Sequence, residues 1–312
     1  MEGGKTMKQP LIFALLLSLL SSALWAQDGS NVGINLGLST WINNCDIPAG
    51  GQNSGLAPAF GPNFTLNFGK FRIGGTFYYG QFDIGAEDGV QQTKDANGDV
   101  VAVSFIDDES LKRGFTSLGD TKRLDFTLNA GYAFNRYAAL SFSLVVNRHE
   151  VDLVTYWFPT IDSGGIGALP IDRAIPFSYT DTQYWLGQHF GGSIPIETVS
   201  TRFSLFYGLG LLVILGESGN SKIGTTEFDS PRISYTLEEG GIAGPSGARD
   251  LGTRPFGENV GVTVNVGAAF QLLNNVGLYG GYNLKFFSED ETDFIDSSKF
   301  HGPFFGINFR VK

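Results

Sequence analysis

Apolar and polar residues alternate along most of this chain, as they do when successive side chains face opposite sides of a β-sheet. In residues 31–41, every second position from Val32 to Leu38 is apolar, and Gly and Asn stand between them. The same alternation recurs along the chain and predicts ten strands, at residues 31–41, 62–69, 71–82, 122–134, 139–157, 182–193, 199–216, 258–270, 276–287 and 302–312.

The connections between these strands alternate in length. Short links follow the even-numbered strands, at residues 69–70, 135–137, 191–195 and 271–275. Long links follow the odd-numbered strands, near residues 43–58, 83–120, 159–181, 217–256 and 289–300. Hairpins with one tight end and one elaborated end are typical of antiparallel up-and-down barrels, which in the outer membrane place short turns in the periplasm and long loops outside the cell.

The composition of the two strand faces favours a membrane barrel over a soluble β-sandwich. The polar face consists mostly of Gly, Asn, Ser and Thr, whereas the solvated face of a sandwich would carry many Lys, Glu, Asp and Gln residues. Small polar side chains suit a narrow lumen. We therefore predict that apolar side chains face lipid and that polar side chains face the inside of the barrel.

Aromatic residues gather near both ends of the predicted strands. Those near the long loops are Trp41, Tyr78, Tyr79, Phe82, Tyr156, Trp157, Phe158, Tyr184 and Trp185. Those near the short turns are Phe71, Phe134, Tyr137, Phe190, Phe270 and Phe309. The sequence thus predicts two aromatic girdles at the two membrane–water boundaries. In the fifth strand the alternation slips near residues 148–151, which predicts a β-bulge or a change to an extramembrane hairpin.

The N-terminus has the pattern of a secretory signal peptide. Lys5 and Lys8 precede the apolar run 11–20, and small residues lead to a cleavage site after Ala26. The run is about half as long as a membrane-spanning helix requires. The predicted organisation is a signal peptide at residues 1–26 and one barrel domain at residues 27–312.

Composition and charge exclude several classes of protein. Only 17% of the residues are charged, and 43 are glycine, which argues against a disordered chain or a helical bundle. The net charge is −10, so a nucleic-acid-binding role is excluded.

The closing segment 301–312 adds a further signal. Gly306, Phe309 and Val311 form a glycine-then-alternating-hydrophobic pattern, although the chain ends in Lys312 where many outer-membrane barrels end in Phe. With the signal peptide and the hairpin pattern, this segment resembles the small bacterial outer-membrane β-barrels of the outer-membrane protein A and W type. The resemblance covers residues 27–312 but points to no subfamily.

The resemblance implies an all-β transmembrane barrel of about ten strands, with eight or twelve as alternatives, in the outer membrane of a Gram-negative bacterium. Its expected partners are outer-membrane lipid, lipopolysaccharide and the barrel-assembly machinery, which would read the closing segment. Another envelope protein is a further candidate partner.

Few charged residues fall on the predicted inner face. They are Arg72, Asp125, Arg202, Lys285 and Arg310. Ten strands enclose only a narrow interior, so a wide porin is not expected. These residues are candidates either for a structural ion-pair network or for the lining of a thin water path.

The long loops are acidic, and we expect most of this charge to be a solvated surface. Glu289, Asp290, Glu291 and Asp293 form the densest cluster and are candidates for a surface Ca²⁺ or Mg²⁺ site. No other cofactor is expected. Residues 94–99 are predicted to be the turn of a β-hairpin, because their spacing does not fit a calcium-binding loop.

Two histidines offer weak signals for catalysis. His149 with Glu150, and His301 with Asp290 or Asp293, could act as general-base pairs, but no accompanying nucleophile pattern is present. The sequence therefore predicts a non-enzymatic barrel whose acidic loops bind a partner or support a membrane-protein assembly. A narrow channel for small solutes is the alternative, and a barrel hydrolase is the least favoured hypothesis.

Overall fold

The structure is a computed structural model of the chain. It describes residues 32–46, 54–84, 91–94, 96, 100–104, 115–157, 169–170, 173–196, 202–235, 237–238, 241–242, 248–257, 259–287 and 299–311. The predicted signal peptide, residues 1–26, lies outside the described residues.

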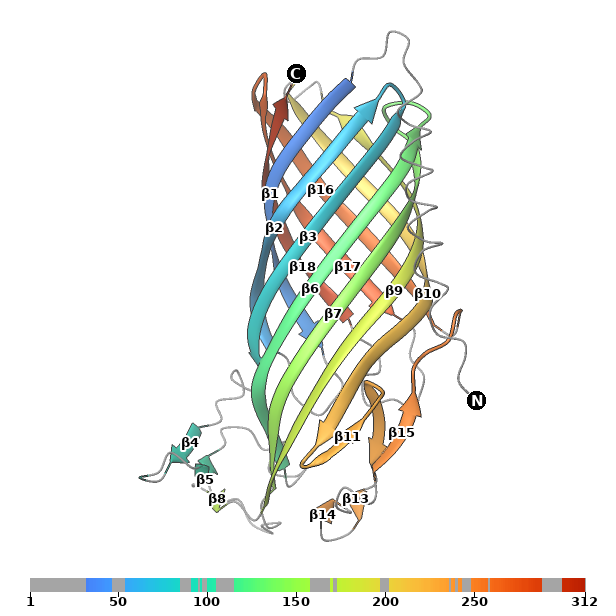
Figure 1. Cartoon of the computed structure of the whole chain (residues 1–312). Coiled ribbons are helices and arrows are strands. Elements are labelled where there is room, and N and C mark those ends of the chain that lie inside the picture. The colour runs from blue at the N-terminus through green and yellow to red at the C-terminus, as the bar shows by residue number, and fades with distance from the viewer. Residues whose placement is uncertain are drawn as a thin grey trace.

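Ten long antiparallel strands form a closed barrel, seen from the side in Figure 1. They are β1 (Val32–Asp46), β2 (Ser54–Phe68), β3 (Phe71–Ile84), β6 (Phe115–Ala133), β7 (Ala139–Trp157), β9 (Arg173–Pro195), β10 (Phe203–Ile223), β16 (Val260–Leu273), β17 (Val276–Phe287) and β18 (Lys299–Val311). Each strand pairs with the next of the ten in chain order, and β18 pairs with β1 to close the ring. The prediction of a ten-stranded up-and-down barrel is confirmed.

Shorter strands lie at the long-loop end of the barrel (Figure 1). They are β4 (Gln91–Lys94), β5 (Val100–Ser104), β8 (Leu169–Pro170), β11 (Thr226–Phe228), β12 (Arg232–Tyr235), β13 (Leu237–Glu238), β14 (Gly241–Ile242) and β15 (Ala248–Gly252). β4 and β5 form the predicted hairpin, and β5 also pairs with β8, so that the three strands form a sheet separate from the barrel wall. β11 extends the barrel sheet at β10.

The turns at the opposite end are tight. Gly69, between β2 and β3, has a φ of 61°, a left-handed conformation that glycine adopts without steric cost. Between β6 and β7, the Asn135 side chain accepts hydrogen bonds from the backbone N–H groups of Tyr137 and Ala138 at 2.8 and 3.0 Å. The prediction of a turn at residues 191–195 is wrong, because β9 continues through them to Pro195.

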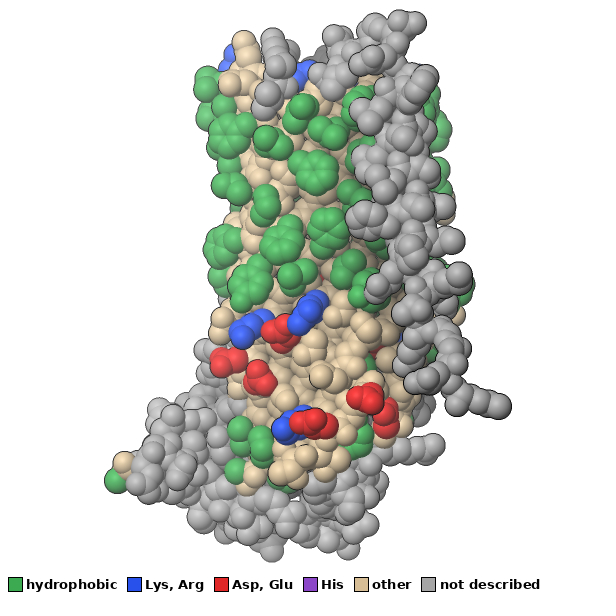
Figure 2. Space-filling view, in the orientation of Figure 1, with side chains coloured by type: hydrophobic (Ala, Val, Ile, Leu, Met, Phe, Trp, Pro, Cys, Tyr) green, Lys and Arg blue, Asp and Glu red, His purple; other side chains and the backbone are tan. Residues whose placement is uncertain are grey.

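An apolar belt covers the outside of the barrel on the face seen in Figure 2. Exposed hydrophobic side chains on its strands include Leu38, Phe60, Phe71, Phe142, Leu186, Leu211, Leu278 and Phe305. Towards the long loops the belt gives way to a band of charged side chains. On β6 and β7 the apolar belt ends at the outward-facing Leu124 and Val146, and Lys122 and Arg148 follow them at exposed positions. We take the belt as the membrane-spanning part.

At the level where the outer face becomes charged, the inner face changes from polar to apolar. Beyond the belt, the inward-facing side chains become apolar and form the extracellular core, which consists of Val151, Leu153, Phe177, Tyr179 and Ile223. The register of β7 with β6 and β9 is unbroken here, so the predicted bulge at residues 148–151 is wrong. The slip in the alternation instead marks the point where the strand leaves lipid and enters water.

The predicted outer girdle is wrong in three members. Trp41 and Trp185 are 1% and 0% exposed and lie inside the barrel, as does Tyr78, whose ring packs against Trp41. Strand parity explains this placement, because Trp41 is in phase with the inward-facing Ser39. Tyr79 and Tyr184 do face outward, and the six aromatic residues predicted near the short turns are all exposed. Among the described residues, no helix has the length and apolar character needed to cross a membrane.

Candidate functional site in the barrel lumen

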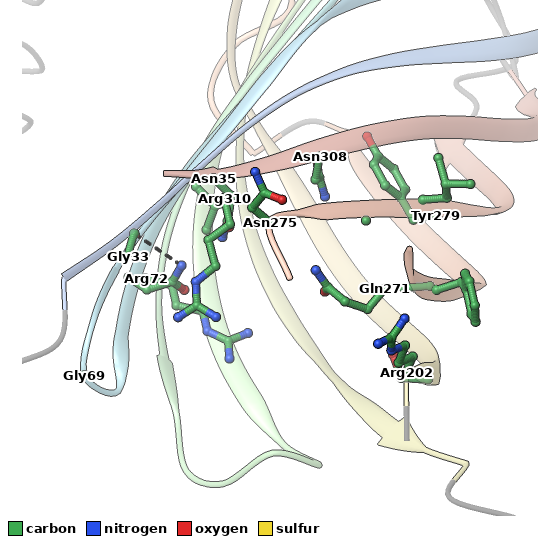
Figure 3. Close-up of a pocket in the computed structure, with 17 residues that line it drawn as sticks. Gly33, Asn35, Gly69, Arg72, Arg202, Gln271, Asn275, Tyr279, Asn308 and Arg310 are labelled. Carbon is green, nitrogen blue, oxygen red and sulfur yellow. Dashed lines mark hydrogen bonds between the residues drawn. The ribbon is translucent and has the colours of Figure 1, made fainter. Parts of the chain in front are cut away.

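A cavity of about 880 Å³ occupies the short-turn end of the lumen (Figure 3). Three of the five predicted lumen charges, Arg72, Arg202 and Arg310, line it. Amide side chains, including those of Asn35 and Asn308, line it as well, and none of its described lining residues is acidic. Because short turns face the periplasm in this class of fold, this cavity is a positively charged periplasmic mouth.

The arginines reach the cavity from different strands. Arg72 lies on β3 and Arg310 on β18, and Figure 3 shows both on one side of the cavity, with Arg202 on the opposite side. The Arg202 guanidinium donates a hydrogen bond to the backbone carbonyl of Leu272 at 3.3 Å. The cavity therefore has guanidinium groups on two sides, and the one on the Arg202 side is held in place by its hydrogen bond to Leu272.

A layer of packed side chains crosses the lumen near the outer edge of the apolar belt. This closing layer consists of Trp41, Arg123, Asp125, Lys285 and Phe300. The Arg123 guanidinium lies 3.7 Å from the ring centroid of Phe300 and 5.0 Å from that of Trp41, and it forms a 2.7 Å ion pair with Asp125. The Lys285 ammonium lies 5.2 Å from the Trp41 ring. Cation–π contacts and a buried ion pair therefore hold the layer together.

Apolar side chains pack beside the closing layer. Val145, Trp185, Leu212 and Ile214 form a buried cluster, against which Phe287 packs. The Phe287 ring lies 4.6 Å from the Trp185 ring and 5.9 Å from the Phe300 ring, measured between centroids, and so joins the cluster to the closing layer. Side chains from opposite walls thus fill the lumen at this level.

The structure divides the five predicted lumen charges between two places. Arg72, Arg202 and Arg310 line the periplasmic cavity, whereas Asp125 and Lys285 belong to the closing layer. Sequence reasoning missed Arg123, although its separation from Asp125 by two positions on one strand places both on the same face. That parity was the signal that could have found it.

A hydrogen-bonded histidine lies deeper in the lumen. Ser143 Oγ lies 2.6 Å from His189 Nε2, and Thr263 Oγ1 lies 3.4 Å from His189 Nδ1. Gly187 and Gly210 make room for this group, since a Cβ at Gly210 would collide with the imidazole ring. A nucleophile–base pair needs a group that orients the base, usually a carboxylate. Here a threonine hydroxyl takes that position.

The structure contradicts one of the two histidine pairs predicted from the sequence, that of His149 with Glu150. His149 faces inward and packs against Phe300, with ring centroids 5.6 Å apart, whereas Glu150 faces outward and binds Arg148 at 2.6 Å. The pair of His149 with Glu150 is therefore wrong, because neighbouring residues of a strand face opposite sides. His301 Nδ1 instead lies 2.6 Å from the Tyr282 hydroxyl.

The predicted cation site falls outside the described residues. Glu289, Asp290, Glu291 and Asp293 all belong to the segment between β17 and β18 that the structure does not describe. The partners predicted for His301, Asp290 and Asp293, fall there too. Within the described part of the chain, no group of three or more His, Cys, Asp or Glu side chains could hold a metal ion.

Two carboxyl groups meet inside the barrel wall beyond the membrane. Asp181 on β9 and Glu217 on β10 are both buried. Gln183 Nε2 donates to Asp181 Oδ2 at 2.7 Å, and the Arg254 backbone N–H donates to Glu217 Oε2 at 2.9 Å. Burial, and next the negative charge of Glu217, raise the pKa of the Asp181 carboxyl well above its usual value, against the opposing effect of Arg254. The Asp181 carboxyl therefore holds its proton to a higher pH than a free aspartic acid does, while Glu217 forms an ion pair with Arg254 at 3.8 Å.

His149 also lies beyond the membrane-spanning part. Burial, with a smaller effect from the Arg123 charge, lowers the pKa of His149 from 6.5 to about 3. The imidazole is therefore neutral throughout the physiological range, and its Nε2 atom has no hydrogen-bond partner in the described structure.

Several solved structures are similar in fold. The outer-membrane protease OmpT from Escherichia coli is 11% identical in sequence, with a TM-score of 0.46 over 89% of this chain and 97% of the protease. Neisserial surface protein A is 10% identical, with a TM-score of 0.32 over 90% of this chain and 99% of that protein. The toluene transporter TodX from Pseudomonas putida is 10% identical, with a TM-score of 0.36 over 93% and 92% of the two chains. No protein-family model and no curated protein sequence matches this chain.

The architecture itself defines the class of protein. A closed antiparallel barrel with an apolar outer belt, tight turns at one end and long loops at the other is the form of outer-membrane β-barrels. This chain is an integral protein of the bacterial outer membrane.

Proposed function

We propose that this protein is a non-conducting, non-enzymatic surface barrel that presents a rigid extracellular platform for binding. The observation that carries this proposal is the closing layer. Arg123 and Trp41 are 3% and 1% exposed, so side chains fill the lumen at their level. A protein whose lumen is closed in this way transports nothing without rearranging its interior.

The outer part of the barrel supports the second half of the proposal. Four consecutive strands extend beyond the belt: β6 and β7 have 19 residues each, β9 has 23 and β10 has 21, against 12 to 15 in the other barrel strands. The extracellular core backs this extension, and Phe228 of β11 packs against the core. Burial of such side chains contributes about 1.5–3 kcal/mol each, enough to hold a curved sheet above the membrane.

The loops on this platform are acidic, as residues 85–114 between β3 and β6 show with seven Asp and Glu against three Lys and Arg. A surface of this sign favours a basic partner, because complementary charge accelerates encounter and rejects acidic competitors. We propose another envelope protein as that partner. We also propose that lipopolysaccharide surrounds the belt and that the barrel-assembly machinery acts during insertion. Residues 289–293 would bind Ca²⁺ or Mg²⁺.

The arrangement around His189 supports the absence of catalysis. Its Nδ1 atom faces the Thr263 hydroxyl and its Nε2 atom contacts the Ser143 hydroxyl, so neither nitrogen contacts a carboxylate that would orient a general base. The group is better explained as a set of lumen hydrogen bonds that satisfies three polar side chains.

A narrow channel for small solutes is the second candidate. The observation in its favour is the periplasmic cavity, which leaves part of the lumen open from one side. Conduction would then require the closing layer to move aside.

Planar-bilayer recording with the purified protein tests the proposal. We expect no discrete openings from the wild type and stable openings from a Trp41→Ala/Phe300→Ala double variant, which removes two large side chains of the closing layer. Tyr79→Ala, an outward-facing replacement at the same end of the barrel, is the matched control and should stay silent. Discrete wild-type openings would favour the channel instead.

A further inference from the structure

We infer that the periplasmic cavity is a binding site for a small soluble anion that carries two or more carboxylate or phosphate groups. The cavity, of about 880 Å³, has the size of small-molecule sites, which span roughly 300–1,000 Å³. Its open end faces the short turns, and the closing layer lies deeper in the lumen. The site is thus a pocket entered from the periplasm.

The charge of the cavity selects an anion. Three guanidinium groups line it, and its described lining contains no Asp or Glu. Within the described part of the chain, the side chains of Arg72 and Arg310 make neither a hydrogen bond nor an ion pair. A guanidinium offers a planar fork of donors that matches a carboxylate or a phosphate in bidentate fashion.

The placement of the arginines selects a ligand with more than one anionic group. Arg72 and Arg310 extend into the same side of the cavity, so one oxyanion can lie between them, while Arg202 stands across the cavity (Figure 3). Amide groups such as those of Asn275 and Asn35 lie along the wall as additional hydrogen-bond donors. A ligand with two anionic groups can span the cavity and reach the guanidinium groups on both of its sides.

The position of the cavity separates this site from lipid binding. Arg72 follows the outward-facing Phe71 on β3, and Arg310 follows the outward-facing Phe309 on β18. Because neighbouring residues face opposite sides of the sheet, both arginines lie on the lumen side, and the barrel wall separates them from the leaflet. The ligand therefore comes from the periplasmic solution and not from a phospholipid headgroup.

Isothermal titration of the full mature protein in a neutral, phosphate-free detergent tests this inference. The probes are citrate, which carries three carboxylates, and inorganic pyrophosphate. We expect saturable binding of at least one probe, at one site per barrel, with an affinity that falls as salt is added. Sucrose, a neutral probe of similar size, should not bind.

Variants locate the site. Arg72→Gln/Arg310→Gln should weaken binding at least tenfold, whereas Arg72→Lys/Arg310→Lys, which keeps the charge and loses the fork, should weaken it less. Lys70→Gln is the matched control, since Lys70 is an exposed cation of the neighbouring short turn that does not line the cavity. It should leave the affinity unchanged. The heat-dependent gel shift of folded barrels checks that each variant is folded.

Three results would overturn the inference. Neither probe binds to saturation, or Lys70→Gln weakens binding as much as the double arginine variant does, or only phosphatidylglycerol added to the micelles binds through these arginines. The result is independent of the proposed function, because a silent barrel can hold an anion in its periplasmic mouth and a conducting one can lack it.

Discussion

Arg123 and Asp125 form a 2.7 Å ion pair inside the lumen, where each side chain is only 3% exposed. Both residues come from β6, two positions apart, so the strand itself presents the two charges side by side. The aromatic rings of Trp41 and Phe300 cover the guanidinium from other strands. Arg123 thus pairs with Asp125 on its own strand and also contacts side chains that reach across the lumen from β1 and β18.

Removing one member of this pair should be costly. Arg123→Met leaves the Asp125 carboxylate buried beside Lys285 alone, and we expect a loss of about 3 kcal/mol in the free energy of unfolding, the low end of the range for broken buried pairs. Guanidinium unfolding in detergent micelles measures it. Arg123→Met/Asp125→Asn should recover most of the loss. Lys222→Met, which breaks the exposed 3.1 Å pair with Glu227, is the control and should change stability by less than about 1 kcal/mol.

Asp181 should make the extracellular part of the barrel more stable in acid than at high pH. Its pKa is raised in the folded state, so the folded protein holds a proton that the unfolded chain releases above its own lower pKa. Stability therefore falls as pH rises from the unfolded value towards the raised folded value, by at most about 1.4 kcal/mol per pH unit for one proton. Asp181→Asn should remove this slope and raise stability at neutral pH.

Unfolding of this variant between pH 4 and pH 8 provides the measurement. Asp152→Asn, which replaces an exposed carboxylate on the neighbouring strand β7, is the matched control and should keep the wild-type slope. An Asp181→Asn protein that is less stable than the wild type at pH 7 would contradict a raised pKa of Asp181.

His149 should act in the opposite direction. Because its folded pKa is lowered from 6.5 to about 3, the unfolded chain takes up a proton below pH 6.5 that the folded protein does not. Stability therefore falls as pH drops from 6.5 towards 3. His149→Phe should flatten this acid limb and leave stability at pH 7 unchanged within about 1 kcal/mol, since the ring packs in an aromatic setting. A variant with the full wild-type acid limb would show that another group is responsible.

The inward orientation of two tryptophans can be tested by fluorescence. In a protein whose only tryptophan is Trp41 or Trp185, brominated lipid should quench the emission weakly, because both rings are buried in the lumen. A Tyr79→Trp or Tyr184→Trp variant with no other tryptophan places the ring on the outer surface and should be quenched strongly. Strong quenching of Trp41 would show that its ring faces lipid, as the predicted girdle requires.

Strand parity carried most of what the sequence could predict. Alternation predicted the number of strands. It also predicted whether residues such as Arg72 and Lys285 face inward or outward, because the residues beside them in the sequence determine that face. The placement of Trp41 and Trp185 failed where position near a strand end was weighed above parity. The pairing of Ser143 with His189, 46 positions apart, depends on how neighbouring strands are registered, and the closing layer depends on which residues face each other across the lumen. Alternation within a strand contains neither relation.

The exchange of apolar and polar faces along β7 has a consequence for how deeply the protein sits in the bilayer. Val146 and Arg148 are consecutive outward-facing residues, so the outer surface changes from apolar to charged within two residues of the strand. Sinking the barrel would drag Arg148 and Lys122 into hydrocarbon at a cost that grows to about 2–4 kcal/mol per basic residue at the midplane. Raising it would lift the outward-facing Leu124 and Val146 out of lipid and draw the polar short turns into hydrocarbon. The apolar-to-charged boundary on the strands thus fixes the depth of the protein in the bilayer, and it also fixes the height of the extracellular sheet above the membrane surface.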